Sequence, residues 1–510
     1  MAHAHHKSDF HTVEFQVDPV VLELGQRFVD AGHELSLVGG PVRDIFLGRT
    51  SPDLDFTTDA TPGQTVSLIK KWADNYWEIG RAFGTIGMRK AGFQIEITTY
   101  RAEAYDPESR KPVVAFGSSL TDDLLRRDFT INAMALRLPS LELVDPFGGV
   151  RDLQASVLAT PGAPESSFSD DPLRMMRAAR FASQLGVSVH DDVRLAMSQM
   201  AERITIISAE RVRDELTKLI CGAHPRVGID LLVDTGLSEF VLPEVSALRL
   251  ESDEHHRHKD VYHHSLQVLE QAAALETAAD GPVPGPDFVL RFAALMHDVG
   301  KPATRRFEPG GAVSFRHHDM VGSKLTAKRM KTLRFDNDTI KAVARLVELH
   351  MRFYGYGEAG WSDSAVRRYV TDAGPLLERL HRLTRSDVTT RNQRKSERLS
   401  FAYDDLETRI AALREQESLE AVRPDLDGAR IMALLGLKPG PVVGRAYKFL
   451  LEERMEHGPL DLAVAERKLH EWWAQQPESA PPAQETAQSP DDVELSPSEP
   501  APKLAPKQES

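Results

Sequence analysis

The sequence predicts an α+β protein, in which a small mixed sheet with helices is followed by a mostly α-helical remainder. Three observations predict this fold class. Short runs with alternating apolar residues, typical of strands with one buried face, lie among helical patterns in the first 160 residues. From Asp170 to about Trp473 the apolar residues recur with helical spacing. A chain of 510 residues exceeds what one hydrophobic core organises, so roughly two to four domains are expected.

Two Pro/Gly-rich breaks, at residues 160–164 and 280–286, divide the chain together with changes in composition. The polar, histidine-rich opening segment looks like a tag and is left out of the fold. The last segment is rich in Pro, Ala, Ser and Gln, which predicts disorder. The expected regions are a disordered N-terminus (1–17), a head that contains the sheet (18–160), a helical neck (161–250), a histidine-rich metal-binding region (251–395), a helical C-terminal region (396–473) and a disordered acidic tail (474–510).

The composition is that expected of a cytoplasmic protein without a membrane partner. No apolar run reaches the roughly 18 to 20 residues of a membrane helix, and no signal peptide is expected. The single cysteine, Cys221, excludes internal disulfides and is typical of a reducing compartment. The formal net charge of −14 comes partly from the acidic tail, while basic clusters lie at residues 324–334 and 379–398. Overall charge therefore does not exclude a nucleic-acid partner.

Two aspartates one residue apart, Asp53 and Asp55, lie in the strand-like run DLDFTT. Side chains alternate along a strand, so these carboxylates project from the same face, where they repel unless a divalent cation lies between them. A third acid, Glu96, lies between the apolar residues of the strand QIEIT. Taken alone, these acids fit either a metal site or a strand face exposed to solvent.

Two glycines, Gly39 and Gly40, end an apolar strand and precede a short helical segment. Backbone N–H groups there can approach a triphosphate without obstruction by a Cβ, and Arg43 can add charge-assisted contacts. Two cations held by three acids beside such a turn suit in-line attack of a hydroxyl on an α-phosphate. The segment therefore predicts a nucleotidyl-transfer site.

Five motifs follow one another in the order of a known family: GGPVRD with DLDF, RRDFTINAMAL (126–136), DPFGGVRDL (145–153), DDPLRMMRAARF (170–181) and ERVRDEL (210–216). In these motifs the chain resembles the class II (bacterial-type) tRNA nucleotidyltransferases, the CCA-adding enzymes, and their poly(A) polymerase relatives. The resemblance implies that Asp53, Asp55 and Glu96 are catalytic and bind Mg²⁺. It also implies a hinge at Asp145 and Gly148–Gly149, and nucleotide contacts by the following residues: Gly39, Gly40, Arg43, Arg127, Asp128, Asn132, Asp171, Arg174, Arg177 and Arg180.

Asp171 and Arg174 suggest how bases are chosen without a template. At i and i+3 they are expected to share one helix face. A carboxylate accepts and a guanidinium donates hydrogen bonds, which suits cytosine and adenine and rejects uracil and guanine. An ordinary helix salt bridge is the alternative interpretation. The family usually has Glu-Asp where this chain has Asp170-Asp171. Arg177 and Arg180 are expected to contact phosphates that position the tRNA.

Beyond residue 250 histidines become dense, and the pattern resembles the HD phosphohydrolase superfamily; residues 251–395 are called the HD domain below. The resemblance implies metal ligands at His264, His297, Asp298 and Asp387, with His318 and His350 as candidates that extend the site. His263 and His317 are left as non-ligands. Imidazole and carboxylate ligands on separate helices suit a divalent ion such as Mg²⁺, Mn²⁺ or Ni²⁺.

The resemblance implies a cytoplasmic enzyme that adds CCA to the 3′ end of tRNA from CTP and ATP, with phosphohydrolase activity of the HD domain as an additional candidate. A segment with Arg110 and Lys111 resembles a loop that full CCA-adding members carry, which favours addition of the final A. The alternatives left open are a poly(A) polymerase, an enzyme that adds only part of CCA, and an HD phosphohydrolase whose head binds RNA.

Overall fold

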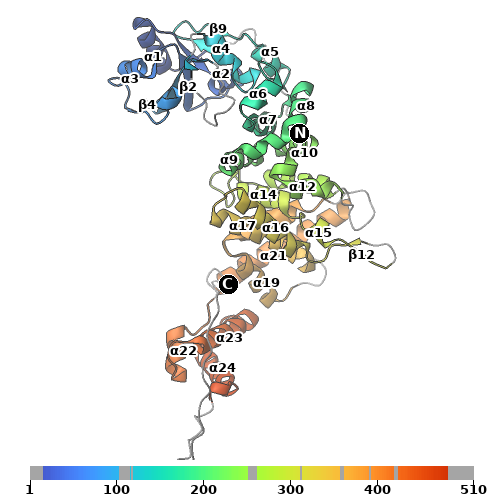
Figure 1. Ribbon diagram of the computed structural model, residues 1–510. Helices are drawn as coiled ribbons and strands as arrows, with labels where there is room; N and C mark the ends of the chain where they lie inside the picture. Colours follow the sequence, from blue (N-terminus) through green and yellow to red (C-terminus); the bar gives the residue numbers. More distant parts are fainter. Residues whose placement is uncertain are drawn as a thin grey trace, which may run out of the picture. The chain divides into compact units, whose positions relative to one another are not determined.

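The computed structural model describes residues 15–102, 115–116, 119–250, 261–309, 313–356, 361–389, 392–417 and 423–479. The loop with Arg110 and Lys111, the first 14 residues and the tail beyond residue 479 lie outside the described residues. The chain forms two compact units, Met1–Ala412 and Leu413–Ser510. An α+β head is followed by helices, as the sequence predicts (Figure 1).

The head is built on a seven-stranded sheet with the strand order β3-β4-β5-β2-β1-β8-β9. Only β2 and β5 pair in parallel; the other pairs of this sheet are antiparallel. This parallel pair lies at the middle of the sheet, and both of its strands carry predicted acids. The strands are β1 (Leu35–Val38), β2 (Asp53–Thr58), β3 (Asn75–Trp77), β4 (Thr85–Lys90), β5 (Phe93–Thr99), β8 (Ala135–Arg137) and β9 (Leu143–Val144).

One face of the sheet is buried, and the other carries polar side chains around β2 and β5. Helices α1 (Pro19–Asp30), α2 (Gly40–Phe46) and α3 (Pro62–Ile69) contact strands β1, β2, β4 and β5. Along β2, Leu54 and Phe56 are buried, whereas Asp53 and Asp55 are exposed. The alternation follows from the strand geometry that places successive side chains on opposite faces.

The helical neck begins with a break that the sequence reading missed. Helix α6 (Pro164–Asp170) ends before Asp171, which is extended with φ −144°, and α7 (Leu173–Leu185) begins after Pro172. The prediction that Asp171 and Arg174 share one helix face is therefore wrong. Proline disfavours the helical conformation in the residue before it, which explains the break. The neck continues with α8 (Asp191–Met200), α9 (Ala209–Ile220), α10 (Pro225–Asp234), α11 (Ser238–Val241) and α12 (Pro243–Ser246).

In the HD domain, apolar helix α14 (Phe288–Met296) is buried from Leu290 to Met296. It contacts α13 (Val261–Ala274), α17 (Asn337–Leu349) and α20 (Leu377–Ser386). The buried Arg291 on α14 lies 2.6 Å from Glu276 and donates 2.7 Å to the carbonyl of Gly222 in the neck. This contact ties the HD domain to the neck. Further helices of this domain among the described residues are α15 (Lys301–Thr304), α16 (His318–Thr332) and α19 (Asp363–Ala373), and α21 (Gln393–Glu417) follows it.

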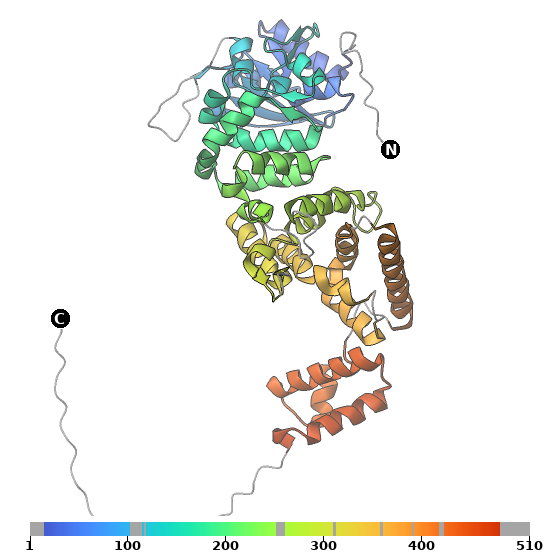
Figure 2. The ribbon, with the colours of Figure 1, turned by 90° about the vertical axis from the view of Figure 1, so that its right-hand side faces the viewer.

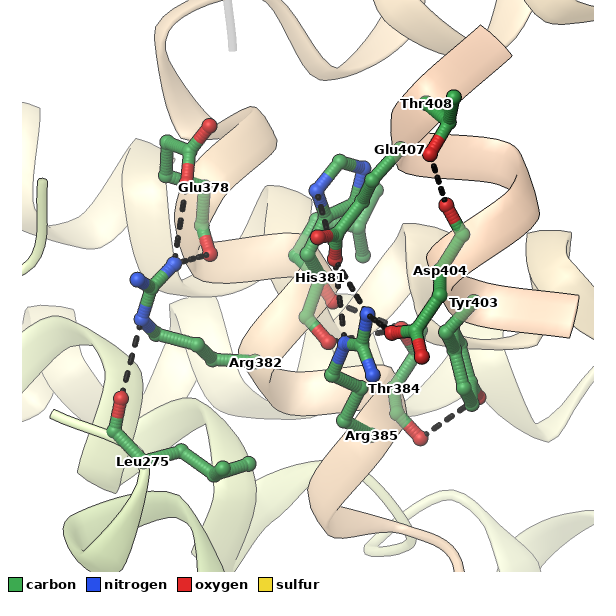
Figure 3. Close-up of polar contacts among 11 residues, drawn as sticks. Leu275, Glu378, His381, Arg382, Thr384, Arg385, Tyr403, Asp404, Glu407 and Thr408 are labelled. Carbon is green, nitrogen blue, oxygen red and sulfur yellow. Dashed lines mark hydrogen bonds and ion pairs between the residues drawn. The ribbon is translucent and has the colours of Figure 1, made fainter. Parts of the chain in front are cut away.

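Helix α21 is held against α20 by the polar contacts drawn in Figure 3. Arg385 lies 2.7 Å from Asp404 and 2.9 Å from Glu407. The Tyr403 hydroxyl donates 2.8 Å to the carbonyl of Thr384. Because Asp387 follows directly on the last turn of α20, these contacts also help to position that predicted metal ligand.

The second unit is a small helical bundle of α22 (Gly428–Leu435), α23 (Pro441–His457) and α24 (Leu462–Ala474), drawn in orange to red in Figure 2. Its core contains Leu426, Ile431, Ala446, Leu450, Ala465 and Leu469. Within the described residues, no helix combines the length and the apolar character needed to cross a membrane.

Candidate active site and metal centre

The three predicted acids of the head lie on one face of the sheet. Asp55 on β2 pairs in register with Glu96 on β5, and Asp53 lies two residues from Asp55 on that same face. Although part of the Asp55 side chain reaches solvent, desolvation by the surrounding protein raises its pKa; the nearby Arg127 lowers the pKa and Asp53 raises it. The pKa of Glu96 is also raised, by burial first and then by the charges of Asp55 and Asp53. The acids therefore repel one another, as expected of carboxylates that share a cation.

The glycine turn lies beside these acids. Strand β1 ends next to β2, with Leu37 opposite Phe56, and Gly39 has a φ of 75°, which favours glycine. A Cβ at Gly39 would lie 3.0 Å from Nη1 of Arg127. The turn, in which Gly39 is buried and Gly40 partly exposed, and the Arg127 guanidinium therefore lie together near Asp55.

Four predicted residues form one hydrogen-bonded chain between head and neck. Arg43 donates 2.8 Å to Asn132 Oδ1, and Asn132 Nδ2 donates 3.1 Å to the buried Asp128. Arg177 on α7 donates from Nε to the other oxygen of Asp128 at 2.8 Å. Burial alone would raise the pKa of Asp128, but Arg177 and Asn132 hold it below the ordinary value. This network fixes the neck helix to the head next to the glycine turn.

The predicted base-selecting pair is separated in this structure. Asp171 lies 2.9 Å from Arg211, whereas Arg174 donates 2.8 Å to Ser167 Oγ and 2.6 Å to the carbonyl of Arg126. The charge of Asp171 still acts on Arg174, so the two groups remain neighbours. The loop conformation of Asp171 leaves its carboxylate on the surface, where Arg211 from α9 reaches it.

Two further predicted positions have structural partners. Arg180 lies 3.2 Å from the buried Glu215, and its guanidinium lies over the ring of Phe181. At the predicted hinge, the carboxylate of Asp145 accepts hydrogen bonds from the backbone N–H groups of Gly149 (2.7 Å) and Val150 (3.0 Å). Asp145, three residues before the N-cap residue Gly148, thus accepts hydrogen bonds from the first two backbone N–H groups of α5 (Gly149–Gln154).

The six predicted ligands of the HD domain converge on one place, although they come from five helices and their ends. Two groups have ligand atoms within 4.8 Å of one another: His264, His297 and Asp387, and Asp298, His318 and His350. Asp387 lies 2.9 Å from His264 Nε2 and 3.5 Å from His297 Nε2. His318 and His350 approach each other to 3.2 Å between their Nε2 atoms. His263 and His317 belong to neither group.

The outer nitrogens of these histidines are held in place. Nδ1 of His297, His318 and His350 each lies within hydrogen-bond distance of the carbonyl three residues earlier, at 2.8, 2.9 and 2.6 Å. His264 Nδ1 lies 3.1 Å from the hydroxyl of Thr389. Such contacts orient the Nε2 atoms toward the centre, as the outer contacts of metal-binding histidines do.

The donor set fits a divalent metal. His297 Nε2 and Asp298 Oδ2 are buried and lie 3.3 Å from each other, without a well-formed hydrogen bond; their close neighbours are charged groups, Asp387 and Lys301. Burial lowers and the two neighbouring aspartates raise the pKa of His297, to about 10, whereas burial and the other histidines lower the pKa of His350 to about 4. The opposite shifts of His297 and His350 follow from their neighbours, since His297 lies beside two carboxylates whereas His350 lies beside other imidazoles. In the head, by contrast, the carboxylate oxygens of Asp53, Asp55 and Glu96 do not all lie within 4.8 Å of one another.

Lys301 is a residue of this centre that sequence reasoning missed. Its Nζ lies 2.9 Å from Oδ2 of Asp298, on the first turn of α15. The i, i+3 spacing from Asp298 was the available signal. Its ammonium group therefore brings a positive charge to the edge of the cluster.

Together, the acid pair on the sheet, the glycine turn and the linked neck define a nucleotidyltransferase, joined here to a helical metal-binding domain. Three family descriptions match the chain: "Poly A polymerase head domain" over residues 35–159, "Probable RNA and SrmB- binding site of polymerase A" over residues 186–248, and "HD domain" over residues 261–392. The chain belongs to the class II tRNA nucleotidyltransferases of the poly(A) polymerase family, and it is an enzyme.

Relatives differ in how much of the chain they match. An A-adding tRNA nucleotidyltransferase from Deinococcus radiodurans is 35% identical over 427 residues, which cover 82% of this chain and 91% of the relative. A CCA-adding enzyme from Lactobacillus helveticus is 42% identical over 217 residues, 42% of this chain and 53% of the relative. A CCA-adding enzyme from Bacillus pumilus likewise matches 43% of this chain and 54% of the relative, at 41% identity. The chain spans about half the length of these CCA-adding relatives.

Solved structures share the fold. The Bacillus stearothermophilus CCA-adding enzyme in complex with CTP has a TM-score of 0.64 at 23% identity, covering 89% of this chain and 98% of that structure. The Thermotoga maritima CCA-adding enzyme complexed with tRNA has a TM-score of 0.58 at 16% identity, covering 91% and 97%.

Proposed function

We propose that the protein transfers nucleotides from CTP and ATP to the 3′ end of tRNA, without a nucleic-acid template, with Mg²⁺ held by Asp53, Asp55 and Glu96. The observation that carries the proposal is the pairing of Asp55 with Glu96 beside the glycine turn and Arg127. Two cations at these acids would activate the 3′ hydroxyl and stabilise the departing pyrophosphate. Because its substrate is tRNA, we place the enzyme in the cytoplasm.

Base selection is assigned to Asp171 and Arg174 within the same proposal. Their charges interact, although Asp171 pairs with Arg211 in this structure. When a nucleotide enters, Asp171 would exchange Arg211 for the exocyclic amine of cytosine or adenine, and Arg174 would donate to the ring nitrogen. The two anchoring contacts of Arg174 keep its guanidinium in one orientation, which favours discrimination.

The experiment supplies tRNA that lacks its last three nucleotides with each NTP separately and together, and reads the products at one-nucleotide resolution. We expect incorporation of two C residues with CTP alone, and of one further A when ATP is added. Failure to extend any tRNA end with any NTP would overturn the proposal. Continued growth with ATP alone would instead identify a poly(A) polymerase.

Addition of the terminal A alone is a second candidate. One observation favours it. The Deinococcus radiodurans relative, which aligns over most of both chains, is named an A-adding enzyme, whereas the two CCA-adding relatives align over about half of their length. The same assay separates the two. An A-adding enzyme would extend only tRNA that already ends in CC, and it would leave tRNA without these nucleotides unchanged in CTP.

We also propose a phosphohydrolase site in the HD domain, for phosphate monoesters or cyclic phosphates at RNA ends, with Mg²⁺, Mn²⁺ or Ni²⁺. The buried set of four histidines and two aspartates, with Lys301 beside it, supports this activity. Phosphate release from a 2′,3′-cyclic or 2′-phosphate substrate should disappear in His297→Ala, while nucleotide addition persists. No phosphate release from either substrate with any of the three metals would remove this proposal.

A further inference from the structure

A row of polar residues continues the acid face of the head away from the glycine turn. In the strand register, Asn75 on β3 is opposite Arg89 on β4, Arg89 is opposite Gln94 on β5, and Gln94 is opposite Asp53 on β2. Residues in register on neighbouring strands project from the same face. These four side chains are exposed and line one open cavity of about 560 Å³, together with Pro52, Asp74 and Gly92.

A second row, two residues further along the strands, carries an aromatic ring. Trp77 is opposite Gly87, and Gly87 is opposite Glu96, which in turn is opposite Asp55. The indole lies directly over Gly87, because a Cβ at this glycine would be 2.1 Å from Trp77 Nε1. The half-exposed ring thus lies on the acid face, one strand away from Glu96.

Among the described residues, the Arg89 side chain has no polar partner. It is exposed, and its guanidinium forms no ion pair or hydrogen bond with any residue that the structure describes. Two acids line this cavity: Asp74 is engaged by Lys90 at 3.2 Å and by the backbone N–H of Ala91 at 2.9 Å, and Asp53 is one of the three acids proposed to bind Mg²⁺. The guanidinium is therefore free to bind an anion in the cavity.

We infer that Arg89, Gln94 and Trp77 bind the 3′-terminal nucleotides of the RNA that is extended; the inference rests on the proposed function. In an in-line displacement the attacking hydroxyl and the leaving pyrophosphate lie on opposite sides of the α-phosphate. The glycine turn and Arg127, which bind the triphosphate in the proposed function, lie on the β1 side of the acids. The attacking RNA end therefore enters from the β5–β4–β3 side.

The chemistry of these three residues suits an RNA end whose sequence changes. Arg89 contacts a phosphodiester, which every nucleotide has, and Gln94 can reach a ribose hydroxyl. Trp77 offers a surface for base stacking, which tolerates any base because every base has a π-face. A terminus that gains a new nucleotide in each cycle requires such sequence-independent contacts.

The test uses tRNA ending in CC with ATP, a reaction that both candidate enzymes perform. Arg89→Gln and Trp77→Ala should each raise KM for this tRNA about tenfold and leave KM for ATP unchanged. Arg81→Gln is the matched control: Arg81 is an exposed arginine at the opposite end of β4, paired with Glu78, and its removal should change neither constant. Gly87→Ala should reproduce the effect of Trp77→Ala, since a Cβ there displaces the indole.

A second arm removes the negative charge from the last phosphodiester of the tRNA with a methylphosphonate. This change should weaken use of the tRNA by the wild-type enzyme about tenfold and by Arg89→Gln hardly at all. Three outcomes would overturn the inference. The Arg89→Gln or Trp77→Ala enzyme could show a higher KM for ATP but not for tRNA, Arg81→Gln could raise KM for tRNA as much as Arg89→Gln does, or Arg89→Gln could leave both KM values unchanged. If the wild-type enzyme adds no A to this tRNA, the proposed function itself has failed, whatever the variants do.

Discussion

Asp55 on β2 and Glu96 on β5 lie directly opposite each other, in the one parallel strand pair of the head sheet. They are 41 positions apart in the sequence, and the register brings them to one exposed face. The charges of both groups act on each other and on Asp53. A cation that bridges strands needs this arrangement, and the following predictions begin from it.

Asp55→Asn should abolish nucleotide addition. The change keeps the shape of the side chain but removes a negative ligand, so kcat should fall by about 10³-fold or more. Asp59→Asn is the control, because Asp59 follows the same strand but accepts a hydrogen bond from the backbone of Glu34 away from the acids. Single-turnover incorporation of labelled ATP measures both. Activity within tenfold of wild type in Asp55→Asn would contradict the metal assignment.

The demand for Mg²⁺ should rise as the pH falls. Burial and mutual repulsion raise the pKa values of Asp55 and Glu96 above the ordinary carboxyl values of about 4, so protons compete with the cation at higher pH than usual. The Mg²⁺ concentration for half-maximal rate should therefore increase between pH 7.5 and 5.5. Titrations of the rate with Mg²⁺ at several pH values give this dependence. A half-maximal concentration independent of pH over this range would argue against raised pKa values.

The contact between Arg177 and Asp128 should stabilise the first unit. Asp128 is buried, and Arg177→Ala leaves its carboxylate with hydrogen bonds from only Asn132 and one backbone N–H. The free energy of unfolding should therefore fall by about 3 kcal/mol. Because the pKa of Asp128 is lowered in the folded protein, this stabilisation is present above about pH 4 and is lost as the pH falls through the folded pKa. Urea unfolding at pH 7 and at pH 3 measures the difference.

The control for this variant is Arg151→Ala. Arg151 pairs with Asp152 at 3.1 Å, but the Arg151 side chain is 77% exposed. Its removal should therefore lower the free energy of unfolding by less than about 1 kcal/mol. Equal losses in the two variants would show that burial of the Asp128 pair contributes nothing.

Removal of metal should destabilise the HD domain. The cluster gathers six potential metal ligands, four of them buried, and a metal at about 100 times its dissociation constant would stabilise the folded protein by about 2.7 kcal/mol. We expect a strong chelator to lower the midpoint of thermal unfolding, and His350→Ala to reduce the metal content measured by mass spectrometry. His263→Ala is the control, since this exposed histidine belongs to neither donor group. Equal metal content in both variants would exclude His350 as a ligand.

Cys221 should react slowly with alkylating reagents. Burial raises the pKa of its thiol to about 11, although the nearby Arg291 opposes the shift. Since the thiolate is the nucleophile, alkylation by iodoacetamide at pH 8 should be about 100-fold slower than for an exposed cysteine. Mass spectrometry with time gives the rate, and protein unfolded in urea is the control. Equal rates for folded and unfolded protein would show that the thiol is accessible.

Local sequence determined much of the head and of the HD domain. The spacing of Asp53 and Asp55 places both on one face of a strand, and the glycines before them require a turn, because both properties depend only on neighbouring backbone. The family motifs named the six HD positions, and the structure gathers all six in two adjoining groups. Pro172 indicates a break before α7, but the apolar spacing on both sides of it is helical, so the sequence pattern predicts one continuous helix there.

Tertiary structure alone decided the partners. Three relationships join residues about 40 or more positions apart in the sequence. They are the strand register that sets Glu96 opposite Asp55, the hydrogen bond between Arg177 and Asp128, and the pairing of Asp171 with Arg211 rather than with Arg174. The placement of Trp77 over Gly87 likewise depends on how two strands align. Sequence periodicity specifies which side of an element a residue occupies, but not which other element packs there. Partner choice follows from the packing of the whole unit, where burial and competing charges select one arrangement.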